Sequence, residues 1–161
     1  MNNKTLADLG INKKNNRGYE ELAYLIAVVY NITVAQLETM LREYKLSLAK
    51  FNILMILKYK GGDIGLSQTD ITKSLIVSDG NITGVLDRLQ KDQLVIRAAH
   101  PTDRRINLVR ITLKGSDLVE AIWPRYEEII KSKMKSVNTA EQKKVLAVFY
   151  KLAGALLKEE K

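Results

Sequence analysis

Side chains that carry covalent or metal chemistry are scarce in this chain of 161 residues. Cysteine is absent and histidine occurs once, at His100, which excludes thiolate nucleophiles, cysteine zinc sites and a histidine metal cluster within one chain. His100 lies close to Asp103, but no serine or cysteine nucleophile is positioned to complete a triad. The common phosphate-binding, zinc and calcium motifs are also missing. We therefore expect no metal site, no cofactor and no enzymatic activity.

Basic side chains offer a different chemistry, which is the binding of polyanions. The chain has 26 Lys and Arg against 18 Asp and Glu, a formal net charge of +8. Half of this excess lies between residues 97 and 114, where Asp103 stands against five basic residues: Arg97, Arg104, Arg105, Arg110 and Lys114. A charge cluster is ordinarily a solvated surface, but the turn-forming residues around this one favour contact with nucleic acid.

A second group of polar and small residues lies at the start of a segment in which apolar residues recur every three or four positions. It consists of Ser78, Asp79, Gly80, Asn81, Thr83, Gly84 and Arg88. In the first turns of a helix that enters the DNA major groove, Asn81 can pair with adenine and Thr83 can contact a thymine methyl. The glycines weaken a helix, a cost that close approach to a DNA backbone would explain. The plain alternative is that Ser78 only caps the helix, its favoured role, and that Arg88 lies on a solvated face.

The elements that position these residues follow from apolar spacing. Steps of three and four predict a long helix from Tyr19 to about Tyr44, and Ser47 caps a second helix that ends at Gly61-Gly62. Two short helices follow, the first opened by the capping-box pattern of Ser67 with Asp70 and the second running from Ser78 to about Lys91. Two helices separated by a few residues predict a helix-turn-helix.

After these helices, the spacing of apolar residues changes from that of a helix to that of β-strands. Residues 94–97 and 106–111 are rich in branched side chains and flank the turn formers Pro101 and Asp103, which predicts a β-hairpin, or wing. A helix capped by Thr112 and kinked at Pro124 follows, and then a last helix to about Leu156. The predicted fold is mainly α, a winged helix-turn-helix over about residues 47–112 with a two-stranded wing.

Three ordered pieces within Leu66–Gly115 resemble the winged helix-turn-helix of the MarR family of transcriptional regulators. They are LSQTDITKSL, SDGNITGVLDRLQKDQLV and PTDRRINLVRITLKG. The resemblance covers about residues 19–158 and implies a dimer that binds a pseudo-palindromic operator. It implies a single domain over residues 17–161 after a flexible segment 1–16, with dimerisation helices at about 17–45 and 113–158. An unburied apolar stripe on both terminal helices also predicts a partner chain.

The resemblance also implies roles for individual residues. Arg105 is the side chain that inserts into the minor groove, and Asp103 holds it in place. Ser67 and Gln68 of the first motif helix, and Arg104 beside Arg105, are further candidate DNA contacts. Two positions depart from the family pattern: Gly84 stands where many members carry a larger side chain, and Gln93 stands where a glycine usually ends the helix. A non-glycine residue there predicts a different exit from the helix.

Members of the family are often released from DNA by small anionic or aromatic effectors lodged between the dimer helices and the winged part. Candidate lining residues here are Tyr24, Tyr30, Phe51, Met55, Trp123 and Tyr126. The alternative is that these side chains simply belong to the core, as aromatic residues at helical spacing usually do. Arg42 and Arg125 are candidate cations for an acidic effector.

The function predicted is that of a sequence-specific binder of double-stranded DNA, a homodimeric and ligand-responsive repressor. The alternative is a winged-helix module that acts through protein contacts without operator recognition, and an enzyme acting on an anionic substrate is a third option. The N-terminus lacks a signal-peptide core and no run approaches the ~18 apolar residues of a membrane span. We therefore expect a cytoplasmic protein without membrane contact.

Overall fold

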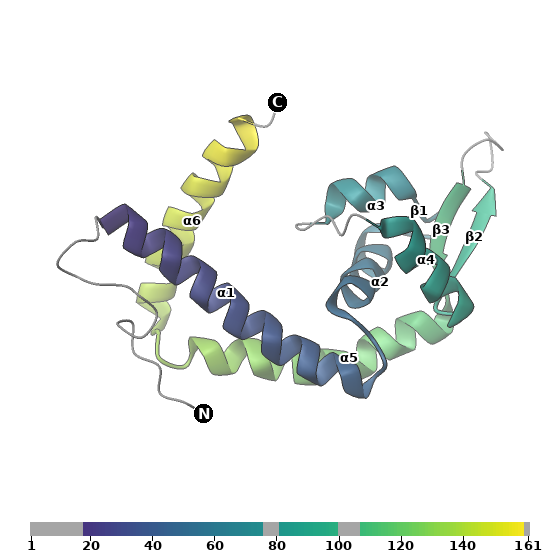
Figure 1. Cartoon of the computed structure of the whole chain (residues 1–161), viewed down its shortest axis with the longest axis horizontal. Coiled ribbons are helices and arrows are strands. Elements are labelled where there is room, and N and C mark those ends of the chain that lie inside the picture. Colours follow the sequence, from purple (N-terminus) through teal and green to yellow (C-terminus); the bar gives the residue numbers. More distant parts are fainter. Residues whose placement is uncertain (1–17, 76–80, 100–106, 160–161) are drawn as a thin grey trace.

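The computed structural model describes residues 18–75, 81–99 and 107–159, which form helices and one small sheet. In chain order the elements are α1 (Gly18–Glu43), α2 (Leu48–Lys60), β1 (Leu66–Ser67), α3 (Gln68–Ser74), α4 (Ile82–Lys91), β2 (Val95–Ala99), β3 (Asn107–Ile111), α5 (Leu113–Met134) and α6 (Thr139–Glu159). Figure 1 shows an arm made of α1, α5 and α6, and a lobe in which α2, α3 and α4 lie beside the sheet. The start of α5 lies against the lobe, and the rest of this helix runs alongside α1.

Buried apolar side chains from the lobe and from the neighbouring ends of α1 and α5 form the hydrophobic core. In α2, Phe51, Leu54 and Leu57 are at most 1% exposed. The other fully buried side chains are Leu41, Ile53, Ile71, Leu86, Leu89, Val95, Val109, Val119 and Ile122. Most of these positions follow the predicted spacing of three and four residues, so the helix faces expected from sequence are the ones that pack.

The sheet has three strands where the sequence predicted a two-stranded hairpin. β2 and β3 pair antiparallel from Val95↔Ile111 to Ala99↔Asn107, and β1 adds to the other side of β3 with Leu66 opposite Val109. Gly65, with φ +93°, permits this approach, because a Cβ there would lie 2.4 Å from the Val109 carbonyl oxygen. A strand this short carries no alternating pattern, so periodicity could not reveal it.

At the exit of α4 the backbone turns through a left-handed residue, Gln93, with φ 60°. The Leu94 N–H donates to the Leu89 carbonyl and the Gln93 N–H donates to the Gln90 carbonyl, each at 2.9 Å. These two bonds define a Schellman motif, the usual glycine-terminated end of a helix. The expectation of a different exit is therefore wrong, since Gln93 adopts the left-handed conformation that glycine usually supplies at the end of a helix.

Replacing Gln93 with glycine is expected to raise the free energy of unfolding by about 0.5 kcal/mol. A left-handed conformation costs an L-residue roughly 1–2 kcal/mol, and the greater freedom of glycine in the unfolded chain offsets part of the gain. Urea unfolding followed by circular dichroism measures the change. Gln90→Gly, in the last turn of the same helix, is the matched control and is expected to lose about 1 kcal/mol. A loss of stability in both variants would contradict the prediction.

The exit of α4 is joined to the start of α5 by Thr112. Its hydroxyl accepts from the Gly115 N–H at 3.0 Å, as the predicted cap of the helix, and donates to the Gln93 carbonyl at 2.8 Å. Gly115 is buried, and a Cβ there would lie 2.3 Å from the carbonyl oxygen of Leu94. Glycine therefore permits the close contact between α5 and the segment that leads into β2.

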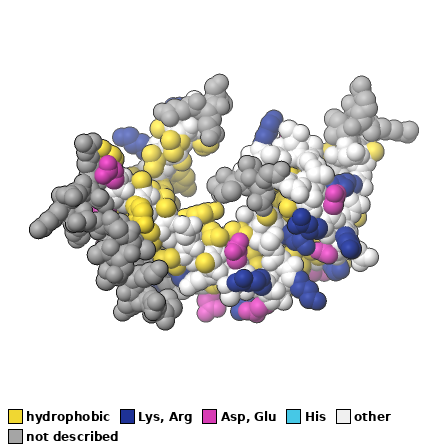
Figure 2. Space-filling model, viewed as in Figure 1, with side chains coloured by type: hydrophobic (Ala, Val, Ile, Leu, Met, Phe, Trp, Pro, Cys, Tyr) yellow, Lys and Arg dark blue, Asp and Glu magenta, His cyan; other side chains and the backbone are white. Residues whose placement is uncertain are grey.

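The arm exposes a wide apolar surface, shown in yellow over α1, α5 and α6 in Figure 2. Among the described side chains of α6 none is buried, and its apolar stripe consists of Val145, Val148, Phe149, Leu152 and Leu156, each at least 42% exposed. α1 adds Leu22, Val29, Tyr30 and Ile32 at about half exposure. A stripe of this length is larger than the single exposed apolar residues that are normal on a monomer.

α1 is also long and apolar enough to cross a membrane, judged by length and composition alone. The sequence expectation that no segment reaches this threshold is therefore wrong. It was based on uninterrupted apolar residues, whereas Asn31 and Thr33 interrupt this run without making the helix polar. A single such helix is a weak sign of a membrane span, and α1 packs along α5.

Candidate nucleic-acid interface

The first turns of α3 and α4, the two helices of the motif, are held together by side chains. Ser67 caps α3: its hydroxyl accepts from the Asp70 N–H at 3.1 Å and donates to the Asp70 carboxylate at 2.6 Å. The next residue, Gln68, donates from its amide Nε2 to Thr83 Oγ1 on α4 at 2.9 Å. This bond brings the predicted candidates on the two helices side by side, and Thr83 is exposed at the surface they share.

The start of α4 differs from the prediction. Ser78 was expected to cap this helix, but α4 begins at Ile82, and the cap is Asn81, whose side-chain oxygen accepts from the Gly84 N–H at 2.9 Å. Both residue types are good caps, and the position at which the backbone enters the helix decides between them. Asn81 therefore has a structural role that was assigned to Ser78.

The same contact explains why a glycine occupies position 84 within the helix. A Cβ at this position would lie 2.7 Å from the side-chain nitrogen of Asn81 and 2.8 Å from its oxygen. The cost of a glycine inside a helix was interpreted as a sign of close approach to a partner. The structure supplies an internal reason, because the space beside Gly84 is filled by the capping side chain.

Substitutions of Asn81 are expected to separate its capping role from DNA contact. Asn81→Ser keeps a capping oxygen, so the free energy of unfolding is expected to change by less than about 0.5 kcal/mol, whereas Asn81→Ala loses about 1 kcal/mol. If Asn81 also pairs with a base, Asn81→Ser weakens binding to a specific duplex about tenfold while stability stays unchanged. Thermal unfolding and a fluorescence titration measure the two effects. Equal affinity for Asn81→Ser and the parent chain would limit Asn81 to capping.

One face of α4 is free for a partner. Ile82, Val85, Leu86 and Leu89 are buried, whereas Thr83, Asp87 and Arg88 point outward. Asp87 pairs with Arg97 of β2 at 2.6 Å, an ion pair that ties the wing strand to the helix. This pair was not among the sequence candidates, although both residues lay within the predicted motif.

Several candidates fall where the structure gives no description. Ser78, Asp79, Gly80, Asp103, Arg104 and Arg105 lie outside the described residues. Of the basic residues assigned to the wing, Arg97 and Arg110 are placed on β2 and β3, and both are exposed. Among the described residues no cluster of His, Asp or Glu could hold a metal ion.

The aromatic candidates for an effector site are partly brought together. The Phe51 and Tyr126 rings are 5.5 Å apart between centroids, and Trp123 stacks on Tyr126 at 5.3 Å. Tyr59, which sequence reasoning missed, extends this row with its ring 6.3 Å from that of Trp123. Tyr59 lies four residues after Met55, which is half-buried beside the core, so the two share one face of the helix. This spacing could have identified Tyr59 from the sequence.

The remaining two aromatic candidates lie on α1, where Tyr24 is 44% and Tyr30 50% exposed. Tyr30 makes no ring contact with any other described side chain. Phe51 is only 1% exposed, so the core role weighed for it is the one observed. Of the three candidate rings that contact one another, Phe51, Trp123 and Tyr126, Trp123 is the most exposed, at 38%.

The two arginines considered as cations for an effector have partners. Arg125 of α5 donates hydrogen bonds from both terminal nitrogens, Nη1 and Nη2, to the carboxylate of Glu43 at the end of α1, and the bond from Nη2 is 3.1 Å long. This hydrogen-bonded pairing lowers the pKa of Glu43 and raises that of Arg125. Arg42 donates to the Thr39 hydroxyl at 2.8 Å. Arg125 thus joins α5 to α1 and is not a free cation.

Two short helices with an outward-facing second helix, followed by a hairpin fixed beside it, define a winged helix-turn-helix, a class of DNA-binding protein. Residues 46–106 match the family model described as the MarR family. The chain also aligns with the transcriptional regulator MhqR of Bacillus subtilis (strain 168) at 34% identity over 119 residues, which is 74% of this chain and 79% of MhqR. The chain belongs to the MarR family of transcriptional regulators.

Solved structures agree with this assignment. Bordetella bronchiseptica BpsR, whose structure was described for the regulation of its DNA binding by 6-hydroxynicotinic acid, superposes with a TM-score of 0.74 at 28% identity. That comparison covers 86% of this chain and 96% of BpsR. S. aureus MepR in complex with DNA has the same fold, with a TM-score of 0.74 at 22% identity over 83% of this chain and 96% of MepR.

Proposed function

We propose that this protein is a homodimeric repressor that binds a pseudo-palindromic operator and is released by a small anionic or aromatic effector. Residues 17–161 act as one functional unit in the cytoplasm. The observation that carries the proposal is the outward face of α4, where Thr83 and Arg88 are exposed beside a wing strand fixed by the Asp87–Arg97 ion pair. A helix with one exposed face fits the DNA major groove, and the basic hairpin beside it fits the adjoining minor groove.

Contacts to DNA divide into base contacts, which give sequence specificity, and backbone contacts, which give affinity. We assign base contacts to Asn81 and Thr83, with Gln68 orienting the Thr83 hydroxyl through their 2.9 Å hydrogen bond. Arg105 enters the minor groove and Asp103 orients it. The remaining candidates approach the backbone, and they are Ser67, Ser78, Asp79, Gly80, Gly84, Arg88 and Arg104.

The dimer is proposed from the arm. The apolar stripe of α6 and the exposed residues of α1 lie on the part of the chain away from the sheet, as Figures 1 and 2 show. A second copy that covers this surface would place two α4 helices on one duplex, as an inverted repeat requires. The 6-hydroxynicotinic acid response named for BpsR supports a small-molecule effector here, and the stacked rings of Trp123 and Tyr126 are the candidate site.

Selection of bound duplexes from a random DNA pool, followed by titrations across a salt series, tests the proposal. We expect an inverted repeat with half-sites about one helical turn apart and a steep loss of affinity with salt. Binding that depends on salt but selects no sequence would refute operator recognition. It would support the alternative of a winged module that acts through protein contacts, which the exposed apolar arm also permits.

Within this experiment, Arg105→Ala is expected to weaken binding to the selected duplex by about 10- to 100-fold, because one inserted or bidentate arginine carries roughly 1–3 kcal/mol. Lys4→Ala removes the same charge from the N-terminal segment and is expected to leave affinity nearly unchanged. Fluorescence anisotropy at fixed salt compares the two variants. Equal affinities would remove Arg105 from the proposed interface.

A further inference from the structure

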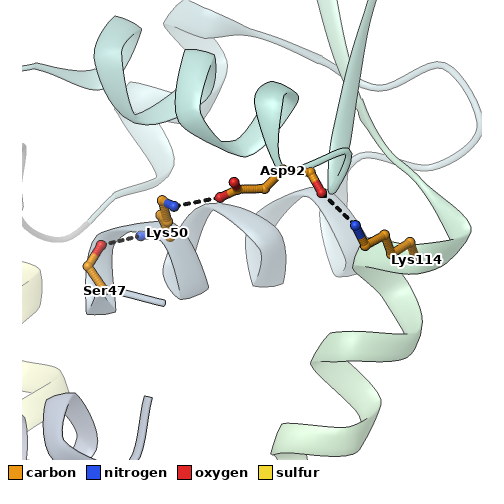
Figure 3. A network of polar contacts seen from close by, with 4 residues as sticks. All are labelled: Ser47, Lys50, Asp92 and Lys114. Atoms are coloured by element: carbon orange, nitrogen blue, oxygen red, sulfur yellow. Dashed lines mark hydrogen bonds and ion pairs between the residues drawn. The ribbon is translucent and has the colours of Figure 1, made fainter. Parts of the chain in front are cut away.

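Asp92 ends α4 and contacts two other helices. Its backbone N–H donates to the Arg88 carbonyl at 2.9 Å, which closes the last turn of α4. Its carboxylate accepts from Lys50 Nζ of α2 at 2.7 Å, and its backbone carbonyl accepts from Lys114 Nζ of α5 at 2.8 Å, as Figure 3 shows. These contacts of Asp92 with Lys50 and Lys114, here called the α4 joint, connect the end of α4 to the starts of α2 and α5.

The lysine of α2 depends on this contact. The Lys50 side chain is only 14% exposed, against 45% for that of Asp92. Its backbone N–H donates to the hydroxyl of Ser47, the cap of α2, at 3.3 Å, so Lys50 lies in the first turn of this helix. A mostly buried ammonium needs a partner, and in the described part of the chain that partner is Asp92. Neutralising Asp92 would leave Lys50 without its counter-charge.

Helix electrostatics disfavours all three charges on the helices that carry them. Lys50 and Lys114 lie in the first turns of α2 and α5, near the positive end of a helix dipole, and Asp92 lies at the negative end of α4. Contact between the helices offsets these effects, because the two lysines reach the carbonyl end of α4 and the carboxylate lies beside the start of α2. The α4 joint therefore explains charges that local helix preference does not.

Asp92 is also the single acid among the residues that line a pocket of about 490 Å³ beside the α4 joint. Four lysines line the same pocket, and they are Lys45, Lys50, Lys91 and Lys114. Like charges around one cavity repel one another, and the carboxylate offsets part of that repulsion. Without it, we expect the lysines to push α4 away from α2 and α5.

We propose that Asp92 is a positioning residue for operator recognition, because it fixes the orientation of α4 relative to α5. The base-contact candidates Asn81 and Thr83 lie at the start of α4, whereas α5 runs from the joint into the arm. In a dimer joined through the arms, the angle between α4 and α5 sets how the two α4 helices face the DNA. This role rests on the dimer and the operator of the proposed function.

Affinity for operators of different half-site spacing tests this role. One base pair moves a half-site by about 3.4 Å and turns it by about 35° around the DNA axis, so fixed α4 helices discriminate between spacings. Asp92→Asn is expected to bind the best duplex about tenfold more weakly, since two α4 helices that are each well oriented about one third of the time must be so together. The affinity ratio between the best spacing and one base pair more is expected to fall at least about threefold.

A substitution that only destabilised the fold would leave this ratio unchanged, and matched variants control for charge. Asp92→Asn makes the net charge more positive, which by itself favours DNA binding. Glu127→Gln makes the same change where the acid pairs with Lys131 within α5 at 3.0 Å, and it is expected to keep the parental ratio. Asp92→Glu keeps the carboxylate and is expected to recover most of the lost affinity. Adding Lys50→Gln to Asp92→Asn is expected to cost nothing further, since both break one ion pair.

A measurement without DNA tests the same joint. The chain contains no cysteine, so Gln90→Cys on α4 and Glu128→Cys on α5 create two labelling sites, both at exposed positions. Double electron–electron resonance between nitroxide labels, with labelled chains diluted in unlabelled ones, gives the distribution of distances between the two helices. Asp92→Asn is expected to broaden this distribution, whereas Glu127→Gln leaves it unchanged.

Three results would overturn the proposal: an equal distance distribution in the parent chain and in Asp92→Asn, an unchanged spacing ratio, or an equal change in Glu127→Gln. Circular dichroism confirms that each variant is folded, and Lys50→Gln, which breaks the same ion pair, replaces Asp92→Asn if that variant does not fold. A parent chain that selects no operator would refute the proposed function. The label distances would still decide whether Asp92 fixes the orientation of α4.

Discussion

Phe149→Asp combined with Leu152→Asp is expected to convert the protein to a monomer at micromolar concentration and to weaken operator binding at least about 100-fold. Both side chains are 42% exposed on the stripe of α6, and a two-fold dimer would bury each of them twice. Losing roughly 1 kcal/mol of apolar burial at each of these positions, and adding carboxylates that must be desolvated, raises the dimer dissociation constant about 1,000-fold or more. Size-exclusion chromatography with light scattering measures the mass.

Ala147→Asp is the matched control for this prediction. It adds a carboxylate to the same helix on the face opposite the stripe, and Ala147 is exposed. This variant is expected to remain dimeric and to bind the operator with nearly parental affinity. A dimer that survives the double substitution, or an equal loss in the control, would show that another surface joins the two chains.

Gly115→Val is expected to destabilise the chain by about 3 kcal/mol or more. The first carbon of any side chain at this position would lie 2.3 Å from the Leu94 carbonyl oxygen and 2.9 Å from the Ile111 side chain. The backbone oxygen cannot move without breaking its 3.1 Å hydrogen bond from the Thr112 N–H. Thermal unfolding followed by circular dichroism measures the effect.

Gly154→Ala provides a comparison of opposite sign. Gly154 lies within α6, and a Cβ at this position would have no described atom of another part of the chain within 4 Å, so alanine adds helix propensity without a clash. We expect a gain of about 0.5–1 kcal/mol. A Gly115→Val variant as stable as the parent chain would contradict the packing described at Gly115.

The helices of this fold were predictable because their apolar residues recur at helical spacing. Leu37 and Leu41 of α1, and Val85 and Leu89 of α4, are buried as that spacing predicts. The start of α4 was not predictable, because Ser78 and Asn81 are both good caps and only the folded backbone selects one. The strand β1 was missed because its pairing depends on residues more than forty positions away in β3.

The candidate interface was predictable in part. Resemblance placed Gln68 and Thr83 on neighbouring helices, and their hydrogen bond agrees with that placement. The pocket lined by Lys45, Lys50, Lys91 and Lys114 could not be found from sequence, since these lysines come from three helices and the turn before α2 and share no motif. Proximity of this kind is created by packing and has no period along the chain.

The junction between β3 and α5 has a consequence for the operator. β3 ends at Ile111 and α5 begins at Leu113, so Thr112 alone separates the wing from a helix of 22 residues that runs into the arm. An α-helix of this length measures about 33 Å, close to one turn of DNA. In a dimer joined through the arms, the length of α5 would act as a ruler between half-sites. Relatives that gain or lose residues in this helix would then read operators of different spacing while keeping the same half-site sequence.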